Sequence, residues 1–356
     1  MRQTIYLEIM RRVVDEQSSN VSKSVERLTD GPAEMKNRFL FMKFLYWLLY
    51  RAAEYSLRAI IFLVPRTPPR LLVLITSATV HLTFAILWPY RKLMEENVSL
   101  AMSDEFLPVE RRKTLVRRAW RNFIQGLYET ARTLDASRDA IRASVAIEGE
   151  EYLKRALEKG NGVIALGAHL GNFTMIGPRV AAVGYPFSIL VKHPPDQRLT
   201  RLLDGYRAKA GVKTISAKPR RQAARQILGA LRRNEVVIVL PDVFKPGSVN
   251  AQFLGAPVYI RRGPVTLALR TGAAVVPMCV TRDAEDRLTL RISPEIDLVK
   301  TGDGQEEVAA NLALFIRHLE AMVRRYPDQW CRLSPHRLPS KNVRPMFAAG
   351  TQAERG

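Results

Sequence analysis

The stretch GVIALGAHLGNFTMIGPRV, residues 162–180, decides the fold class of this chain. Its apolar run Val163–Leu166 is typical of a short buried strand. Residues Asn172–Val183 follow with the pattern of a helix, so the segment predicts a strand, a loop containing His169, and then a helix. A strand followed closely by a helix is the building unit of α/β proteins.

The same alternation continues from about Val145 toward the C-terminus, with Gly and Pro between the runs. Further strands are predicted at Phe187–Val191, Val236–Leu240, Val275–Val280 and Leu288–Ile292. Further helices are predicted at Gln197–Ala210, Arg220–Arg233, Gly263–Thr271 and Gln305–Tyr326. This order predicts an α/β fold with a largely parallel central sheet flanked by helices, and places any site at the carboxyl ends of the strands.

The region before the α/β part has the pattern of membrane-associated helices. Its first half, residues 37–64, is rich in large apolar side chains, and its charges Lys43, Arg51, Glu54 and Arg58 fall within an arc of roughly 80° on a helix. This pattern favours a helix in a bilayer interface, with a helix sunk in a protein groove as the alternative. Residues 71–88 contain no formally charged side chain and are borderline for a span, so an interfacial anchor or helical hairpin is preferred.

These patterns predict four segments. Residues 1–36 are an N-terminal extension, 37–90 are membrane-associated helices, 91–338 form the α/β domain with its leading basic helices, and 339–356 are a C-terminal tail. Residues 1–36 lack the apolar run of a secretory signal, so we expect the chain to stay on the cytoplasmic side.

The charge predicts an anionic partner. The chain of 356 residues has 55 Lys and Arg against 34 Asp and Glu, a net charge of +21, and its 47% hydrophobic content excludes a disordered or collagen-like chain. Residues 192–233 alone hold twelve Lys or Arg and two Asp. Nucleic acid is the generic partner of such a charge, but it leaves the apolar region 37–88 unexplained, so a membrane surface or an acidic carrier is preferred.

Neither a metal nor a cofactor is expected. The two cysteines, Cys279 and Cys331, are far apart in the sequence and offer neither a disulfide framework nor a Cys-based zinc site. The glycines of residues 162–167 are followed by Ala168 and His169 where a phosphate-binding loop needs Lys and Ser or Thr.

His169 is the residue on which a chemical function depends. A loop before a helix offers free backbone N–H groups and the positive end of the helix dipole, which suit a developing oxyanion. A histidine there can take a proton from a hydroxyl. The alternative is a structural histidine that caps the turn.

The string Ala168–Phe173, AHLGNF, resembles the histidine motif of the lipid A acyltransferases, the lauroyl and myristoyl transferases of the lysophospholipid acyltransferase superfamily. The resemblance covers roughly residues 37–338. It continues through VKHPPDQRL (191–199), LPD (240–242), QFLGAPVYIRRGPVTLAL (252–269), TGAAVVP (271–277) and YPDQW (326–330).

The resemblance implies transfer of a fatty acyl chain from an acyl carrier protein or acyl-CoA thioester to a hydroxyl of a lipid A precursor or related glycolipid, on the cytoplasmic face of the bacterial inner membrane. It implies that His169 is the general base and that Gly171, Asn172 and Phe173 supply N–H groups to the oxyanion. Lys192, His193 and Arg198 are expected to contact substrate, and the acceptor lipid is expected to be anionic.

The chain departs from the family pattern at two positions. The family places an acidic residue five positions after the histidine, where this chain has Thr174, and an arginine where this chain has His193 beside Lys192. A threonine can orient an imidazole but supplies no charge. We therefore expect Asp242, after the strand Val236–Leu240, to replace the missing carboxylate beside His169. The alternative is a degenerate homologue that binds lipid, or serves as a scaffold, without catalysis.

Overall fold

A computed structural model describes residues 33–101, 108–243 and 249–330. The predicted C-terminal tail 339–356, Cys331 and nearly all of the predicted extension 1–36 lie outside the described residues. The chain divides into two compact units. One holds the chain up to Ile60 together with His193–Leu203, and the other holds Ile61–Lys192 together with the chain from Asp204 onward. The segment boundaries proposed above at residues 36, 90 and 338 stay predictions.

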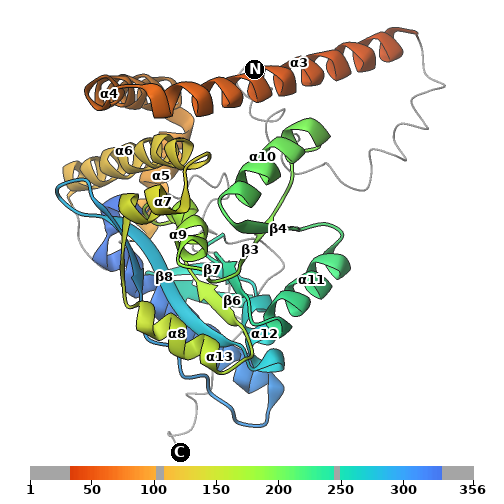
Figure 1. The fold of residues 1–356 in the computed structure, drawn as a ribbon, viewed down its shortest axis with the longest axis vertical. Helices are drawn as coiled ribbons and strands as arrows, with labels where there is room; N and C mark the ends of the chain where they lie inside the picture. Colours follow the sequence, from red (N-terminus) through yellow and green to blue (C-terminus); the bar gives the residue numbers. More distant parts are fainter. Residues whose placement is uncertain (1–32, 102–107, 244–248, 331–356) are drawn as a thin grey trace, which may run out of the picture. The chain divides into compact units, whose positions relative to one another are not determined.

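Long helices occupy the N-terminal part of the chain (Figure 1). They are α3 (Ala33–Leu63), the 3-10 turn η1 (Val64–Arg66), α4 (Pro69–Ile86), α5 (Trp88–Ala101) and α6 (Val109–Thr133). Helices α4, α5 and α6 share a small core around the buried Trp120, whose indole N–H donates to the Thr83 hydroxyl at 3.0 Å. Across the described ranges, none of the helices combines the length and hydropathy that a membrane span requires.

In the smaller unit, two charged residues of the α3 stripe are buried, whereas Arg58 is exposed. Arg51 and Glu54 are buried, and Arg51 pairs with both Glu54 and Asp196, the latter at 2.5 Å. Large apolar side chains of the same helix, among them Phe41 and Trp47, are exposed.

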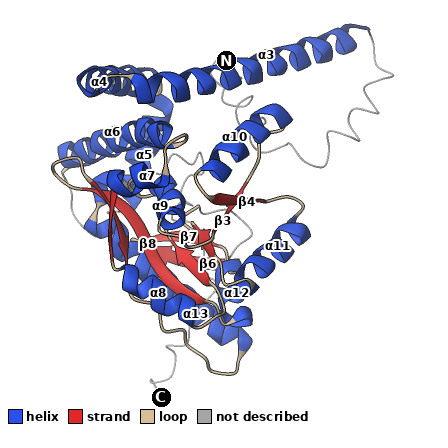
Figure 2. Ribbon diagram, in the orientation of Figure 1, coloured by secondary structure: helices blue, strands red, loops and turns tan. Residues whose placement is uncertain are grey.

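The larger unit is built on a seven-stranded sheet in the order β1-β9-β8-β2-β5-β3-β4 (Figure 2). The strands are β1 (Val145–Glu148), β2 (Val163–Leu166), β3 (Phe187–Val191), β4 (Val212–Ser216), β5 (Val236–Val239), β8 (Ala274–Arg282) and β9 (Leu288–Ile292). Neighbours pair in parallel except β8 and β9, which are antiparallel. The predicted largely parallel sheet is confirmed.

Helices cover both faces of this sheet (Figure 1). Successive residues of β2 point to opposite faces, so Val163 joins one core cluster and Ile164 the other. One face packs against α7 (Arg138–Ser144), α8 (Glu150–Glu158) and α9 (Ile176–Ala182). The other packs against α11 (Arg220–Arg232), α12 (Gly263–Thr271), α13 (Gly304–Arg325) and the hairpin of β6 (Val249–Phe253) and β7 (Ala256–Ile260).

The described residues also form α10 (Gln197–Lys209) and the 3-10 turn η3 (Pro327–Gln329). The five predicted strands are present within one or two residues of their expected bounds. The helix predicted from Asn172 differs, because a 3-10 turn, η2 (Phe173–Met175), comes first and α9 begins only at Ile176. Strands β1 and β4 had not been predicted, since they lie at the sheet edges and contain polar residues such as Glu148 and Lys213.

Candidate active site

The register of two parallel strands brings His169 and Asp242 together. Strands β2 and β5 are neighbours, with Leu166 opposite Val239. Both chains continue in step beyond the strands, where the Gly167 N–H donates to the Val239 carbonyl oxygen at 3.0 Å. Three residues past Leu166 is His169, and three past Val239 is Asp242. The two side chains therefore meet at the carboxyl edge of the sheet, where α/β proteins place their sites.

The Asp242 carboxylate contacts both the ring and the backbone N–H of His169. The ring Nδ1 lies 2.7 Å from Asp242 Oδ1, and the backbone N–H of His169 donates to Asp242 Oδ2 at 2.8 Å. The indole N–H of Trp330 donates to the same Oδ2 at 3.3 Å. The imidazole also meets the ring of Phe173 edge-on, with ring centres 4.8 Å apart. The predicted approach of Asp242 to His169 is present in this geometry.

The electrostatics of the pair favour a proton acceptor on the exposed side of the ring. Asp242 is fully buried, which raises its pKa, but the charge of His169 and the hydrogen bonds from His169 and Trp330 outweigh burial, and the net pKa lies below its usual range. An ionised carboxylate only accepts hydrogen bonds, so Nδ1 carries a proton, and when the ring is neutral its lone pair is on Nε2. The His169 side chain keeps 29% of its surface exposed.

The loop after His169 is fixed by backbone bonds on two sides. The Gly171 N–H donates to the Gln329 carbonyl oxygen at 2.8 Å, and the Asn172 N–H donates to the Val280 carbonyl oxygen at 3.0 Å. Gly171 has a φ of +56°, and a Cβ at this position would collide with the Val280 carbonyl oxygen. The prediction that the Gly171 and Asn172 amides receive an oxyanion is not met in this structure, because both donate to carbonyl groups of the chain.

Thr174 and Asn172 connect the loop to helix α6. The Thr174 hydroxyl donates to Asn172 Oδ1 at 2.7 Å and lies 2.6 Å from the hydroxyl of Thr130. The amide nitrogen of Asn172 donates to Glu129 Oε2 at 3.0 Å. The position where the family has an acidic residue is therefore occupied here by a neutral hydrogen-bonded contact with α6.

An ion pair between a buried arginine and the partly exposed Glu129 supports the same contact from the sheet. Arg282, at the end of β8, makes two bonds to the Glu129 carboxylate, at 2.6 and 2.7 Å. Its own backbone N–H and C=O groups bond to the side-chain amide of Gln329 at 2.9 and 2.7 Å. Because Gln329 also receives the Gly171 N–H, helix α6, strand β8 and turn η3 all meet at the His169 loop.

The other residues predicted to contact substrate, Lys192, His193 and Arg198, are divided between the two units. Lys192 directly follows β3, which neighbours β5 in the sheet. His193 and Arg198 belong to the smaller unit, and Arg198 lies in the first turn of α10, where Asp196 Oδ1 accepts its N–H at 3.0 Å. Their contacts with substrate stay predictions.

Sequence reasoning missed the polar residues that support the loop. Glu129 and Arg282 are far apart in the chain and neither belongs to a motif, so no local pattern indicated them. Gln329 and Trp330 stand in the YPDQW string, which had been noted without a role for either side chain. In the described part of the chain, no three His, Cys, Asp or Glu side chains gather in the way a metal ion needs.

The fold and this site define a class of protein, an α/β protein with an imidazole backed by a buried carboxylate at adjacent strand ends. Comparison with known proteins identifies a family within this class. Residues 42–337 match the family of bacterial lipid A biosynthesis acyltransferases, so the chain belongs to that family. It is thereby an acyltransferase of the lysophospholipid acyltransferase superfamily, as the sequence motifs had predicted.

The chain is similar to named acyltransferases of several bacteria. The lipid A biosynthesis palmitoleoyltransferase of Escherichia coli is 25% identical over 62% of this chain and 70% of its own length. The phosphatidylinositol mannoside acyltransferase of Mycolicibacterium smegmatis is 26% identical over 52% of this chain and 60% of its own length. The 1-acyl-sn-glycerophosphate acyltransferase PlsC of Thermotoga maritima is 14% identical, with a TM-score of 0.32 over 70% of this chain and 96% of its own.

Proposed function

We propose that this protein transfers a fatty acyl chain from a thioester to a hydroxyl of an anionic glycolipid, with His169 as the general base. The observation that carries the proposal is the 2.7 Å contact between His169 Nδ1 and the buried Asp242 carboxylate. A carboxylate behind an imidazole fixes its tautomer and stabilises the cation that forms when the ring takes a proton. A histidine that only capped a turn would not need a fully buried charge behind it.

The proposed reaction has two proton transfers. His169 Nε2 takes the proton of the acceptor hydroxyl, whose oxygen attacks the thioester carbonyl carbon and forms a tetrahedral intermediate. The intermediate collapses, the carbon–sulfur bond breaks, and the imidazolium returns its proton to the leaving thiolate. The products are an ester and a free thiol, and Asp242 stabilises the cation between the two steps. Of the three amides considered for the oxyanion, Phe173 N–H is the candidate that remains.

We propose an acidic carrier protein as the donor. Helix α11 begins just beyond the carboxyl end of β4, at the same sheet edge as His169, and presents exposed arginines in its first half. These side chains, with two more that precede α12, form a basic surface: Arg220, Arg221, Arg225, Arg261 and Arg262. A dense single-sign surface suits a partner of opposite charge. Arg221→Glu should raise KM for the acylated carrier and leave kcat unchanged, whereas Arg317→Glu on exposed α13 should change neither.

We propose that helix α4 places the protein on the cytoplasmic surface of the inner membrane. Large apolar side chains project from it into solvent, including Leu74, which is 67% exposed, and Leu82. Isolated exposed apolar residues are ordinary, but several together on one helix favour an interface. Leu74→Ser together with Leu82→Ser should reduce co-flotation with phospholipid vesicles. Because both side chains are exposed, the free energy of unfolding should stay the same.

Turnover by the purified full-length protein tests the main proposal. The protein is incubated with an acylated carrier thioester, or with acyl-CoA, and with a lipid A precursor, a glycosylated phosphoinositide or a lysophospholipid. We expect a new ester by mass spectrometry, and a loss of about 10²–10⁴-fold in rate for His169→Ala. Full activity of His169→Ala would contradict the role of the base. Lack of turnover with every donor and acceptor would favour the noncatalytic lipid-binding alternative.

A further inference from the structure

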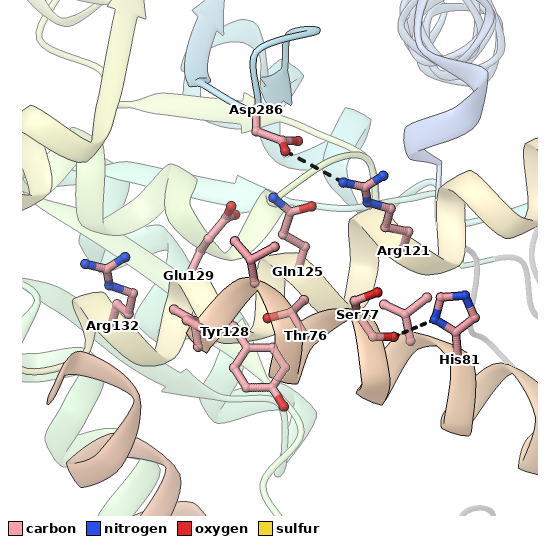
Figure 3. A pocket seen from close by; sticks show the side chains of 12 residues that line it. Thr76, Ser77, His81, Arg121, Gln125, Tyr128, Glu129, Arg132 and Asp286 are labelled. Atoms are coloured by element: carbon pink, nitrogen blue, oxygen red, sulfur yellow. Dashed lines mark hydrogen bonds and ion pairs between the residues drawn. The ribbon is translucent and has the colours of Figure 1, made fainter. Parts of the chain in front are cut away.

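Helices α4 and α6 enclose a cavity that neither His169 nor Asp242 lines (Figure 3). Its volume is about 370 Å³. The two helices are held together beside it, where the hydroxyl groups of Thr79 and Tyr128 lie 2.9 Å apart. The lining comes from α4, from α6 and from the turn between β8 and β9: Leu72, Val73, Thr76, Ser77, Val80, His81, Arg121, Gln125, Tyr128, Glu129, Arg132 and Asp286.

Two arginines and two carboxylates line this cavity. The α6 face contributes Arg121 and Arg132, both exposed, together with Glu129. The charge of Glu129 is already balanced by Arg282, whose guanidinium makes two bonds to the Glu129 carboxylate. Arg121 lies 3.8 Å from the Asp286 carboxylate, a long separation on a half-exposed surface, which leaves its guanidinium able to bind a further anion. Figure 3 shows Arg121, Gln125 and Arg132 along the same helix beside the cavity.

The other side of the cavity is formed by α4, where three apolar side chains stand beside the polar Thr76, Ser77 and His81, and its apolar part continues onto an exposed surface. Leu72, Val73 and Val80 of α4 line it. Val73 lines the cavity and is also largely exposed, next to the exposed Leu74 on the same helix. An apolar wall that runs from a cavity to an exposed apolar helix suits a ligand with an alkyl chain, and the arginines suit a phosphate at its head.

We infer that this cavity binds the phosphate and upper chain of an anionic phospholipid. Its volume is at the lower end of the roughly 300–1,000 Å³ typical of ligand pockets, so the headgroup and first chain segment fit inside while the rest of the chain lies along α4. The site is separate from the proposed catalytic pair and needs no acyl transfer. Glu129 lines the cavity and also accepts from Asn172, which joins the site to the His169 loop by one hydrogen bond.

Binding of dihexanoylphosphatidic acid to the full-length protein, measured by isothermal titration calorimetry, tests this inference. Both glycerol hydroxyls of this probe are already esterified, so it cannot accept an acyl chain at the proposed active site. We expect it to bind at least about tenfold more tightly than dihexanoylphosphatidylcholine, which has no net charge, and than glycerol 3-phosphate, which has no alkyl chain. Equal binding of all three would overturn the inference.

Variants separate this cavity from the rest of the basic surface. Arg132→Gln and Arg121→Gln should each weaken binding of the probe about tenfold. Thr76→Trp should block the cavity without changing the charge. Arg111→Gln is the matched control, because Arg111 is an exposed arginine in the first turn of the same helix and does not line the cavity.

His169→Ala distinguishes this inference from the proposed function. The variant should bind the probe as the unmodified protein does, whether or not the chain is active as a transferase. Loss of binding in His169→Ala would place the probe at the catalytic pair and overturn the inference. So would unchanged binding in Arg132→Gln, or equal losses in Arg132→Gln and Arg111→Gln. Circular dichroism of each variant checks the fold, and the exposed position of Arg132 keeps the test decisive if Thr76→Trp does not fold.

Discussion

Asp242 at the end of β5 and Glu129 in α6 are two carboxylates that act on the same loop in different ways. Asp242 is fully buried and faces a histidine, whose charge depends on a proton. Glu129 is partly exposed and faces Arg282, whose charge is permanent. Asp242 holds the imidazole itself, whereas Glu129 holds Asn172, three residues further along.

The difference separates a chemical role from a structural one. A buried carboxylate whose partner gains and loses a proton stabilises one protonation state over the other, which is what a general base requires. A carboxylate neutralised by arginine stabilises the fold in the same way at every pH near neutrality. We therefore expect substitutions at the two positions to affect different measurements.

Asp242→Asn should have the largest effect, a loss of about 10²–10⁴-fold in turnover. An amide has one acceptor oxygen, whereas the carboxylate uses both oxygens for His169 and adds a third bond from Trp330. The pH–rate profile separates positioning from unfolding, because the loss in turnover should change with pH at temperatures where circular dichroism shows both proteins to be folded. Asp139→Asn on exposed α7 is the control. Retention of more than a tenth of the turnover would remove Asp242 from the proposed mechanism.

Glu129→Gln should act mainly on stability. It leaves the buried Arg282 guanidinium with only the more distant Asp286 carboxylate, 3.8 Å away, and losing the close partner of a buried charge lowers the free energy of unfolding by about 3 kcal/mol. Urea unfolding measures the loss, and adding Arg282→Met should recover part of it. Glu110→Gln, at an exposed pair with Lys113, should cost less than about 1 kcal/mol. If Glu129→Gln lowers turnover more than Asp242→Asn does, the division of roles is wrong.

Trp330→Phe, which changes a hydrogen-bond partner of Asp242, should have a smaller effect than the substitutions at Asp242 and Glu129. It removes the indole donor 3.3 Å from Asp242 Oδ2 and keeps an aromatic ring, so we expect a loss of about 1 kcal/mol in the free energy of unfolding. Trp88→Phe, at an exposed tryptophan, controls for the change of ring. Identical unfolding curves for the two variants would mean that the hydrogen bond from the Trp330 indole does not stabilise the charged form of Asp242 in the folded protein.

The smallest expected effect is the difference in acid stability between the unmodified protein and Asp242→Asn. The pKa of Asp242 lies below its ordinary value of 3.8, so its contribution to stability is present above that value and is lost as the pH falls through the lower pKa of the folded protein. Between about pH 5 and about pH 3, the free energy of unfolding should fall more steeply for the unmodified protein than for Asp242→Asn. Parallel curves would show that the folded state does not hold this carboxyl in its ionised form.

Local patterns predicted most of the sheet and the position of its reactive histidine. Val163–Leu166 and Phe187–Val191 are apolar and β-branched, and both strands were found at their predicted bounds. The start of the next helix was misplaced because Asn172 is held by Val280 and Glu129, partners that its own sequence neighbours do not reveal. The bond to Val280, together with the bond from the Gly171 N–H to the Gln329 carbonyl oxygen, occupies two of the three amides expected to serve an oxyanion.

The sequence by itself determined that strands and helices alternate, and that a histidine follows a buried strand, because the spacing of apolar residues acts over a few positions. The sequence also led us to expect Asp242 beside that histidine, but only the tertiary structure decided how the two side chains meet and which other distant groups support the loop. Asp242 is brought opposite His169 by the register of β2 and β5, and Glu129 meets Arg282 where α6 packs near the end of β8. Such pairs depend on strand order and helix packing, which are set by the free energy of the whole core and not by any short segment.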